Sequence, residues 1–186
     1  MRKKSMPTRR RRAVRQIGAA VLLLVVMNVV WHTYYLFPAQ NLWTVEEAWG
    51  CGRTEVLKRE WSGGRLWYLT ENENAVLLLA QEPSFTGWRS AGANVLDCSG
   101  DSPVHSGFLR AEGWCAFGRV DDPAVASVQL TVYDGLQTTD TQLAGDEDWF
   151  WRDGQRYFLL RSGAETRRAK LTALDREGKV LMERLS

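Results

Sequence analysis

Apolar residues follow two different patterns along the chain, first one long uninterrupted run and then many short segments. The run extends from Ile17 to Phe37 and contains no formally charged residue apart from a histidine, His32. Its 21 residues are close to the ~20 that cross the hydrocarbon core of a bilayer. We therefore predict a transmembrane helix over residues 16–37 that contacts the lipid bilayer directly.

The residues before this helix predict its orientation. The tail at residues 1–15 carries eight lysines and arginines and no acid. Cytoplasmic segments next to a span are rich in positive charge, so we expect the tail in the cytoplasm and the rest of the chain outside. The alternative is a cleaved signal peptide, but bulky residues follow the apolar run in place of a small-x-small cleavage site. We predict an uncleaved single-pass anchor in the plasma membrane.

The remainder, residues 44–186, is predicted to be one mostly β domain that follows a short linker at 38–43. Thr44 and Glu47 have the spacing of a capping box, which predicts a short helix over 45–49 before a glycine. Short alternating or apolar runs bounded by turn residues then predict strands. These strands cover residues 54–61, 65–70, 75–80, 85–89, 113–120, 128–133, 148–151, 156–160, 170–174 and 179–183.

The expected fold is mainly β, a single antiparallel β sandwich or strongly bent sheet with one short helix at its start. Residues 81–107 are the least regular part, because prolines and glycines interrupt the pattern there. We expect this part to be a long irregular stretch with one or two short strands.

The charge of the chain is unevenly distributed. Without the eight bases of the tail, 16 of the 24 Lys and Arg remain against 22 Asp and Glu, which leaves the remainder with a net charge of −6. An acidic domain lacks the basic surface that displaces counterions from nucleic acid. We therefore predict that nucleic acid is not a partner.

The three cysteines allow two interpretations. Outside the membrane, Cys98 and Cys115 could close a disulfide loop of about 18 residues, worth ~3 kcal/mol in the loop-entropy model, with Cys51 left over. Equally, all three could be free thiols.

The sequence shows no pattern of metal ligands. Neither C-x-x-C nor a histidine at ligand spacing occurs, and the acidic run at 146–148 lacks the glycine and distal glutamate of a calcium loop. We predict no metal site and no cofactor.

His105 is the one histidine of the predicted β domain, so a nucleophile–base pair would have to include it. Cys98 and Cys115 are near it in the sequence, and Asp101 could orient its ring. No G-x-S-x-G elbow and no cysteine-enzyme signature accompanies it. We predict no catalytic residues, and a His105-dependent hydrolase is the lesser alternative.

Tryptophan is unusually frequent, with nine residues in the chain, and most of them should be buried. Trp149 and Trp151 alternate with Phe150, which places both indoles on one side of a strand. We predict that Trp149 and Trp151, flanked by Arg152 and Arg156, form a platform that binds a protein or a cell-envelope glycan. Packing of both rings in the core is the alternative.

The order of these segments resembles that of small membrane-anchored proteins of Gram-positive bacteria. The resemblance rests on Glu46-Glu47-Ala48, on Gly87-Trp88, on the stretch Gly118–Val132 and on the final hairpin Ala173–Leu181. It covers most of the chain and concerns turns and strand ends, so it implies a fold and carries no catalytic residues over.

The sequence thus favours a membrane-anchored extracytoplasmic module that binds a protein or an envelope component. A structural or assembly subunit is the alternative, because Asn28 could mark a helix–helix contact within the span.

Overall fold

The computed structural model describes residues 8–31, 37–84 and 87–186. The chain divides into two compact units, residues 1–40 and 41–186. Helix α1 (Thr8–Trp31) contains the segment Ala13–Val30, which is long and apolar enough to cross a membrane. None of that segment is buried. The predicted span extended to residue 37, and its part at 32–36, with His32, lies outside the described residues.

Helix α2 (Phe37–Trp49) is longer than the predicted helix at 45–49, and the predicted linker at 38–43 belongs to it. Apolar spacing explains the difference. Leu42 and Val45 lie three residues apart and pack on the same sheet, so the helical face extends before the capping-box motif. The helix ends before a glycine with a φ of +64°, as the sequence predicted.

Within the described residues, twelve strands form three four-stranded antiparallel sheets. Sheet A has the order β1 (Glu55–Ser62), β2 (Arg65–Asn72), β3 (Ala75–Ser84), β4 (Gly87–Asp97). Sheet B has the order β5 (Val104–Ala111), β6 (Gly113–Val120), β10 (Gln155–Ser162), β9 (Trp149–Arg152). Sheet C has the order β12 (Val180–Leu185), β11 (Arg168–Leu174), β7 (Ser127–Asp134), β8 (Gln137–Leu143). A short 3-10 helix, η2 (Asp146–Asp148), precedes β9. The mainly β antiparallel fold predicted from the sequence is confirmed.

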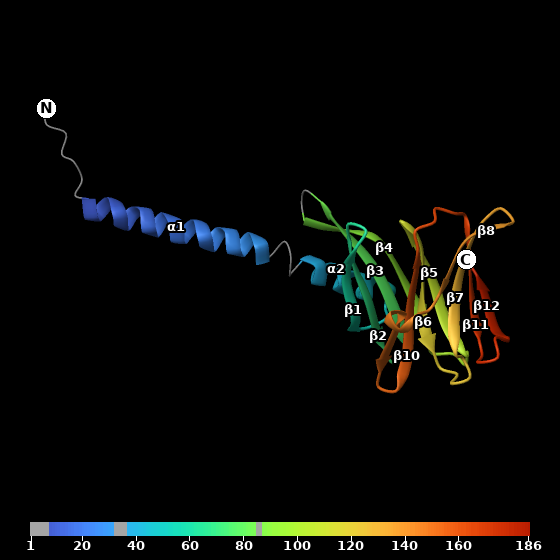
Figure 1. Ribbon diagram of the computed structural model, residues 1–186. Helices are drawn as coiled ribbons and strands as arrows, with labels where there is room; N and C mark the ends of the chain where they lie inside the picture. Colours follow the sequence, from blue (N-terminus) through green and yellow to red (C-terminus); the bar gives the residue numbers. More distant parts are fainter. Residues whose placement is uncertain (1–7, 32–36, 85–86) are drawn as a thin grey trace, which may run out of the picture. The chain divides into compact units, whose positions relative to one another are not determined.

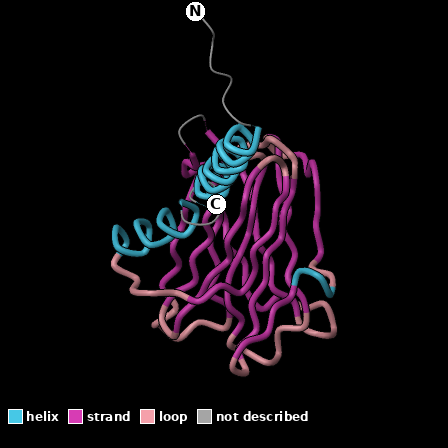
Figure 2. Tube along the Cα trace, turned by 90° about the vertical axis from the view of Figure 1, so that its left-hand side faces the viewer, coloured by secondary structure: helices cyan, strands magenta, loops and turns pink. Residues whose placement is uncertain are grey.

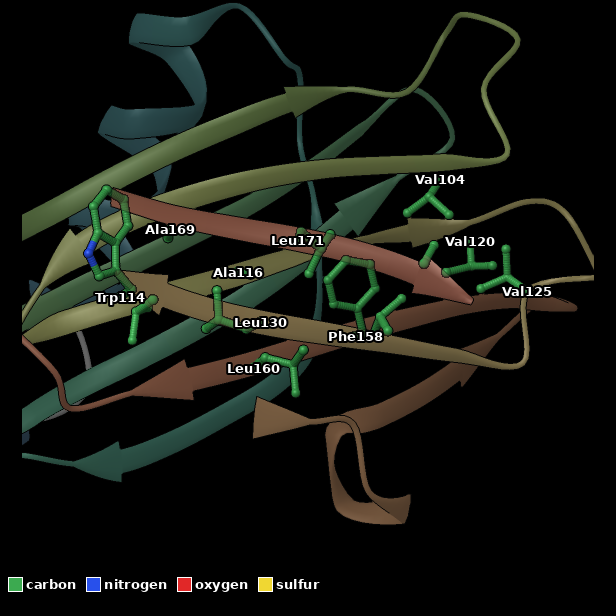
Figure 3. Close-up of a cluster of buried hydrophobic side chains, with 13 residues drawn as sticks. Val104, Trp114, Ala116, Val120, Val125, Leu130, Phe158, Leu160, Ala169 and Leu171 are labelled. Carbon is green, nitrogen blue, oxygen red and sulfur yellow. The ribbon is translucent and has the colours of Figure 1, made fainter. Parts of the chain in front are cut away.

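The three sheets stack as layers, with sheet B in the middle (Figure 1). Side chains of sheets A and B share one core, those of sheets B and C share a second (Figure 3), and α2 covers the outer face of sheet A. The strands of the layers run in roughly a common direction (Figure 2), as in aligned sheet packing. Every residue of β6 is buried, because one face of this strand packs on sheet A and the other on sheet C.

The expectation of a long irregular stretch at residues 81–107 was wrong, because β3 extends to Ser84 and β4 and β5 fill most of the rest. Two of its glycines permit close packing, one between sheets and one within sheet B. A Cβ at Gly92 would lie 3.1 Å from the Leu109 side chain, and one at Gly107 would lie 3.0 Å from the Phe117 ring. Gly92 therefore permits sheets A and B to approach, and Gly107 makes room for the Phe117 ring on the paired strand of its own sheet, whereas the sequence pattern suggested turns.

Strand β8 was also missed from the sequence. Six of its seven residues are exposed, and it lies at the edge of sheet C. A strand without a buried face shows no apolar alternation, so the pattern gave no signal there.

Gly118 of β6 provides a direct test of the packing in sheet B. A Cβ at this position would lie 1.9 Å from the carbonyl oxygen of His105 on β5. We expect Gly118→Ala to lower the free energy of unfolding by about 1–3 kcal/mol through overpacking. Gly100→Ala is the matched control, because nothing lies within 4 Å of the added Cβ. Equal denaturation midpoints for both variants would contradict the close approach of β5 and β6.

Candidate functional site

The sequence-predicted platform lies on the β9–β10 hairpin, at an edge of sheet B. The hairpin turns at Asp153 and Gly154, whose φ angles of +47° and +81° are those of a tight turn. This turn places Arg156 opposite Trp151 and Phe158 opposite Trp149. In an antiparallel pair, opposite residues share a face of the sheet, so both tryptophans lie on the same side as Arg156.

Arg156 holds the two indoles together. Its guanidinium carbon lies 4.6 Å from the ring centroid of Trp149 and 5.7 Å from that of Trp151, within cation–π range. The same guanidinium donates a hydrogen bond to the carbonyl oxygen of Val125, which fixes it from the other side. The platform is therefore a braced structure in which one arginine positions both rings.

The two tryptophans differ in exposure. Trp149 packs edge-on against Phe158, with centroids 6.1 Å apart, and contacts the core between sheets B and C. Trp151 is 69% exposed. Trp149, Trp151 and Arg156, together with Asp146 of η2, line a surface hollow of about 330 Å³. We call these four residues the tryptophan platform. It combines an exposed aromatic ring, a cation and a carboxylate.

Arg152 does not belong to this platform. It alternates with Trp151 along β9 and points to the opposite face, where its Nε lies 3.1 Å from Glu71 and its guanidinium also pairs with Glu55. There it lines a second hollow, of about 670 Å³, with Tyr157. The sequence grouped Arg152 with the tryptophans by proximity, and strand alternation separates them.

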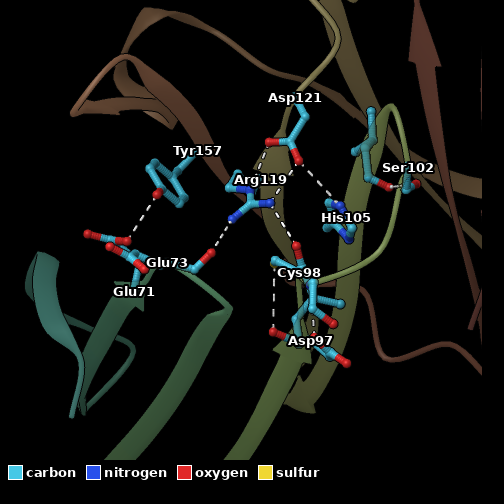
Figure 4. A network of polar contacts seen from close by, with 12 residues as sticks. Glu71, Glu73, Asp97, Cys98, Ser102, His105, Arg119, Asp121 and Tyr157 are labelled. Carbon is cyan, nitrogen blue, oxygen red and sulfur yellow. Dashed lines mark hydrogen bonds and ion pairs between the residues drawn. The ribbon is translucent and has the colours of Figure 1, made fainter. Parts of the chain in front are cut away.

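The second hollow has a buried carboxylate in its wall. The hydroxyl of Tyr157 donates to Glu71 at 3.0 Å (Figure 4), and burial, together with the charge of Glu71, raises the pKa of Tyr157. The phenol is therefore protonated at neutral pH and remains a donor. Because Arg152 also pairs with Glu71, both carboxylate oxygens of Glu71 are occupied by groups of the protein itself.

Arg119 is the centre of a buried polar cluster beside this hollow (Figure 4). Its guanidinium donates to both carboxylate oxygens of Asp121 at 2.8 Å. It also donates to the carbonyl oxygens of Glu73, at 2.9 Å, and Cys98, at 2.8 Å. These carbonyls lie in the β2–β3 turn and just after β4, so one side chain ties sheet B to two loops of sheet A. No pattern in the sequence predicts this cluster, because two of its acceptors are backbone carbonyls of distant residues.

His105 is buried beside the same cluster, with its Nε2 3.3 Å from Asp121. The nearby hydroxyl and thiol bind elsewhere. The Ser102 hydroxyl donates to the carbonyl of Val104 at 2.9 Å, and the Cys98 thiol lies 3.7 Å from the carbonyl of Leu96. Across the described parts of the chain, His105 thus has a carboxylate neighbour and no hydrogen bond from a serine or cysteine nucleophile.

The disulfide that the spacing of Cys98 and Cys115 allowed is not formed, and the three cysteines are free thiols. Both Cys98 and Cys115 are buried in the core between sheets A and B, and the Cys98 carbonyl accepts from Arg119. Burial raises the pKa of both thiols to about 11, which makes them poor nucleophiles at neutral pH.

Glu60 of β1 carries a pH-dependent contribution to stability. Burial alone would raise its pKa, but Lys58, at 2.7 Å, and Arg161 of β10 outweigh burial and hold that pKa below the usual 4.5. A carboxyl whose pKa is lowered by folding stabilises the fold above the unfolded pKa and loses that contribution as the pH falls through the folded pKa.

We therefore expect wild type to be more stable than Glu60→Gln at pH 7, and the difference to shrink steadily below about pH 4.5. Urea denaturation of both proteins across this range measures the difference. Glu177→Gln, at an exposed turn residue, is the control. A difference that stays constant down to pH 2 would contradict the ion pairs of Glu60.

Among the described residues, no three His, Cys, Asp or Glu side chains form a group that could hold a metal ion. The chain matches no protein-family model, no curated protein and no solved structure. The geometry therefore carries the functional argument. Among the described residues, the hollow of the tryptophan platform presents an exposed aromatic ring, and so does a hollow beside Trp43 of α2. The buried charges of the polar hollow already pair with each other.

Proposed function

We propose that the chain is a single-pass plasma-membrane protein whose domain at residues 41–186 lies outside the cytoplasm and binds a neutral cell-envelope glycan. The binding surface is the tryptophan platform. One observation carries the proposal: the side chain of Trp151 is 69% exposed although Arg156 holds its ring in place.

Two observations support the membrane anchor. None of the segment Ala13–Val30 is buried within the described structure. In water, a helix of this composition would therefore expose a large apolar surface. A bilayer removes that surface from water. The eight bases of the tail and the absence of acids before Glu46 favour a cytoplasmic N-terminus, which leaves the β domain on the outer side.

Exposure of Trp151 favours a binding role for the platform. Removing a large apolar ring from water is favourable, and tryptophan is enriched among the residues that dominate binding interfaces. The ring costs little entropy to immobilise on binding, because Arg156 already restrains it. These properties are those of a preformed binding surface.

The chemistry of the hollow favours a sugar. A pyranose ring presents an apolar C–H face that can stack on an indole, and its hydroxyl groups can bond to Arg156 and Asp146 as charge-assisted partners. The volume of about 330 Å³ lies at the lower end of the range for small-ligand sites. The net charge of −6 outside the tail disfavours a polyanionic glycan, which is why the proposal names a neutral one.

The test is a titration of the full chain in nanodiscs with three soluble probes: neutral gluco-oligosaccharides, N-acetylated chito-oligosaccharides and uronic-acid oligomers. We expect one of the neutral series to bind. Arg156→Met should weaken that binding at least about tenfold, because it removes both the brace and a hydrogen-bond donor.

The matched control is Arg110→Met, because Arg110 is an exposed arginine that also stacks on a tryptophan, Trp114, away from the platform. It should leave binding unchanged. Failure of every probe to bind wild type, or equal loss in both variants, would overturn the proposed function.

A further inference from the structure

We infer that the outer face of sheet A, together with α2, rests on the lipid headgroups of the membrane. This inference rests on the membrane anchor of the proposed function and adds a second contact with the same bilayer. The surface consists of Trp43 and Trp49 of α2, Val56 and Trp61 of β1, and the arginines Arg53 and Arg59; we call it the α2 face.

The apolar side chains of the α2 face are unusually exposed for their size. Trp43 is 47% exposed, Trp49 56% and Trp61 57%. Trp61 lies opposite Leu66, a residue that packs under α2, so its ring is on the outer side of sheet A. There it stacks edge-on against Trp88, with centroids 5.6 Å apart. The exposed rings therefore belong to one layer of the domain, the layer that α2 covers (Figure 1).

Cationic groups accompany these rings. The guanidinium of Arg53 lies 5.0 Å from the ring centroid of Trp43, and that of Arg59 lies 5.5 Å from the ring of Tyr68. Arg53 also neutralises the buried Glu46 at 3.0 Å. The α2 face thus combines amphipathic rings with two guanidinium groups, that of Arg53, which Glu46 neutralises, and that of Arg59. Tryptophan prefers the headgroup level of a bilayer, and basic residues are attracted to anionic lipids there.

The connection between the helices favours the bilayer over another occupant. Five residues separate Trp31 at the end of α1 from Phe37 at the start of α2. Even fully extended, this connection spans no more than about 22 Å. A surface tethered so closely to a transmembrane helix meets lipid headgroups at a high effective concentration.

The distribution of tryptophan in the domain agrees with this placement. None of the four strands of sheet C contains a tryptophan, although the chain has nine. The exposed rings at positions 43, 49 and 61 are instead gathered on the opposite outer layer of the stack. A membrane-facing surface accounts for this asymmetry, whereas core packing does not, because these rings are outside the core.

The experiment measures tryptophan fluorescence of the full chain in phosphatidylcholine–phosphatidylglycerol vesicles that contain either a spin label on the headgroup or bromine on the acyl chain. We expect the headgroup label to quench wild type, and Trp43→Phe and Trp61→Phe each to lose part of that quenching. Trp151→Phe is the control, because Trp151 is a still more exposed ring that lies on the platform and not on the α2 face, and this variant should retain the quenching in full.

The outcomes separate this inference from the anchor itself. Co-flotation of the double variant Trp43→Phe/Trp61→Phe with vesicles reports on the anchor. If the double variant floats as wild type does while Trp43→Phe and Trp61→Phe leave headgroup quenching unchanged, the α2 face does not rest on lipid and the inference is overturned. Protection of the same rings from aqueous acrylamide without headgroup quenching would assign the face to contact with a second copy of the chain and would equally overturn the inference.

Discussion

Arg119→Met should lower the free energy of unfolding by about 3–5 kcal/mol, the range for removing one partner of a buried ion pair. Arg119 is nearly buried, and its guanidinium makes four hydrogen bonds, two to Asp121 and two to backbone carbonyls. Methionine fills a similar volume but donates none of them. The variant would leave a carboxylate and two carbonyls without their partner at the junction of sheets A and B.

Urea denaturation of the full chain in detergent micelles, followed by far-UV circular dichroism, measures this effect. Arg167→Met is the control, since Arg167 is exposed and a surface change of this kind usually shifts stability by less than about 0.5 kcal/mol. Indistinguishable midpoints for Arg119→Met and Arg167→Met would show that the cluster does not hold the layers together.

Trp151→Ala should lower the affinity for the oligosaccharide at least about 30-fold, which corresponds to the ~2 kcal/mol of an interface hot spot. The stability of the domain should remain close to that of wild type, because Trp151 is 69% exposed and has little core packing to lose. Isothermal titration with the neutral probe that binds wild type gives the affinity, and thermal denaturation gives the stability.

Trp149→Ala provides the internal comparison. It should weaken binding and also destabilise the domain, because Trp149 packs edge-on against Phe158 at the core between sheets B and C. If Trp151→Ala instead lowers stability as much as Trp149→Ala does and leaves binding intact, Trp151 is a structural residue and the platform is not a ligand surface.

Much of the fold could be predicted from the sequence because most strands are bounded by turn residues and carry apolar side chains at regular spacing. The predicted strand at 113–120 coincides with β6, for example. The stacking of three layers could not be read in this way. Residues of a fully covered strand such as β6 show no polar face. The glycines at 92 and 107 make room for side chains on other strands, Leu109 of the next sheet and Phe117 of the paired strand, and the sequence pattern does not show these partners.

The platform was predictable in part. Alternation in β9 places Trp149 and Trp151 together, and the same rule applied to Arg152 would have excluded it. The position of Arg156 opposite Trp151 follows from a two-residue turn at Asp153-Gly154, a strong hairpin signal in the sequence. The Arg119 cluster was beyond reach, because its carbonyl partners Glu73 and Cys98 lie 46 and 21 residues away along the chain.

The indole region of a nitrogen–proton correlation spectrum shows directly whether the tryptophan platform is the ligand surface. The nine tryptophans give one indole signal each, and Trp→Phe variants assign them. On titration of the ¹⁵N-tryptophan-labelled full chain with the neutral oligosaccharide, we predict that the signals of Trp151 and Trp149 shift. Those of the buried Trp67 and Trp114 should stay in place. Shifts confined to Trp43, Trp49 and Trp61, or no shift at saturating oligosaccharide, would show that the platform is not the ligand surface.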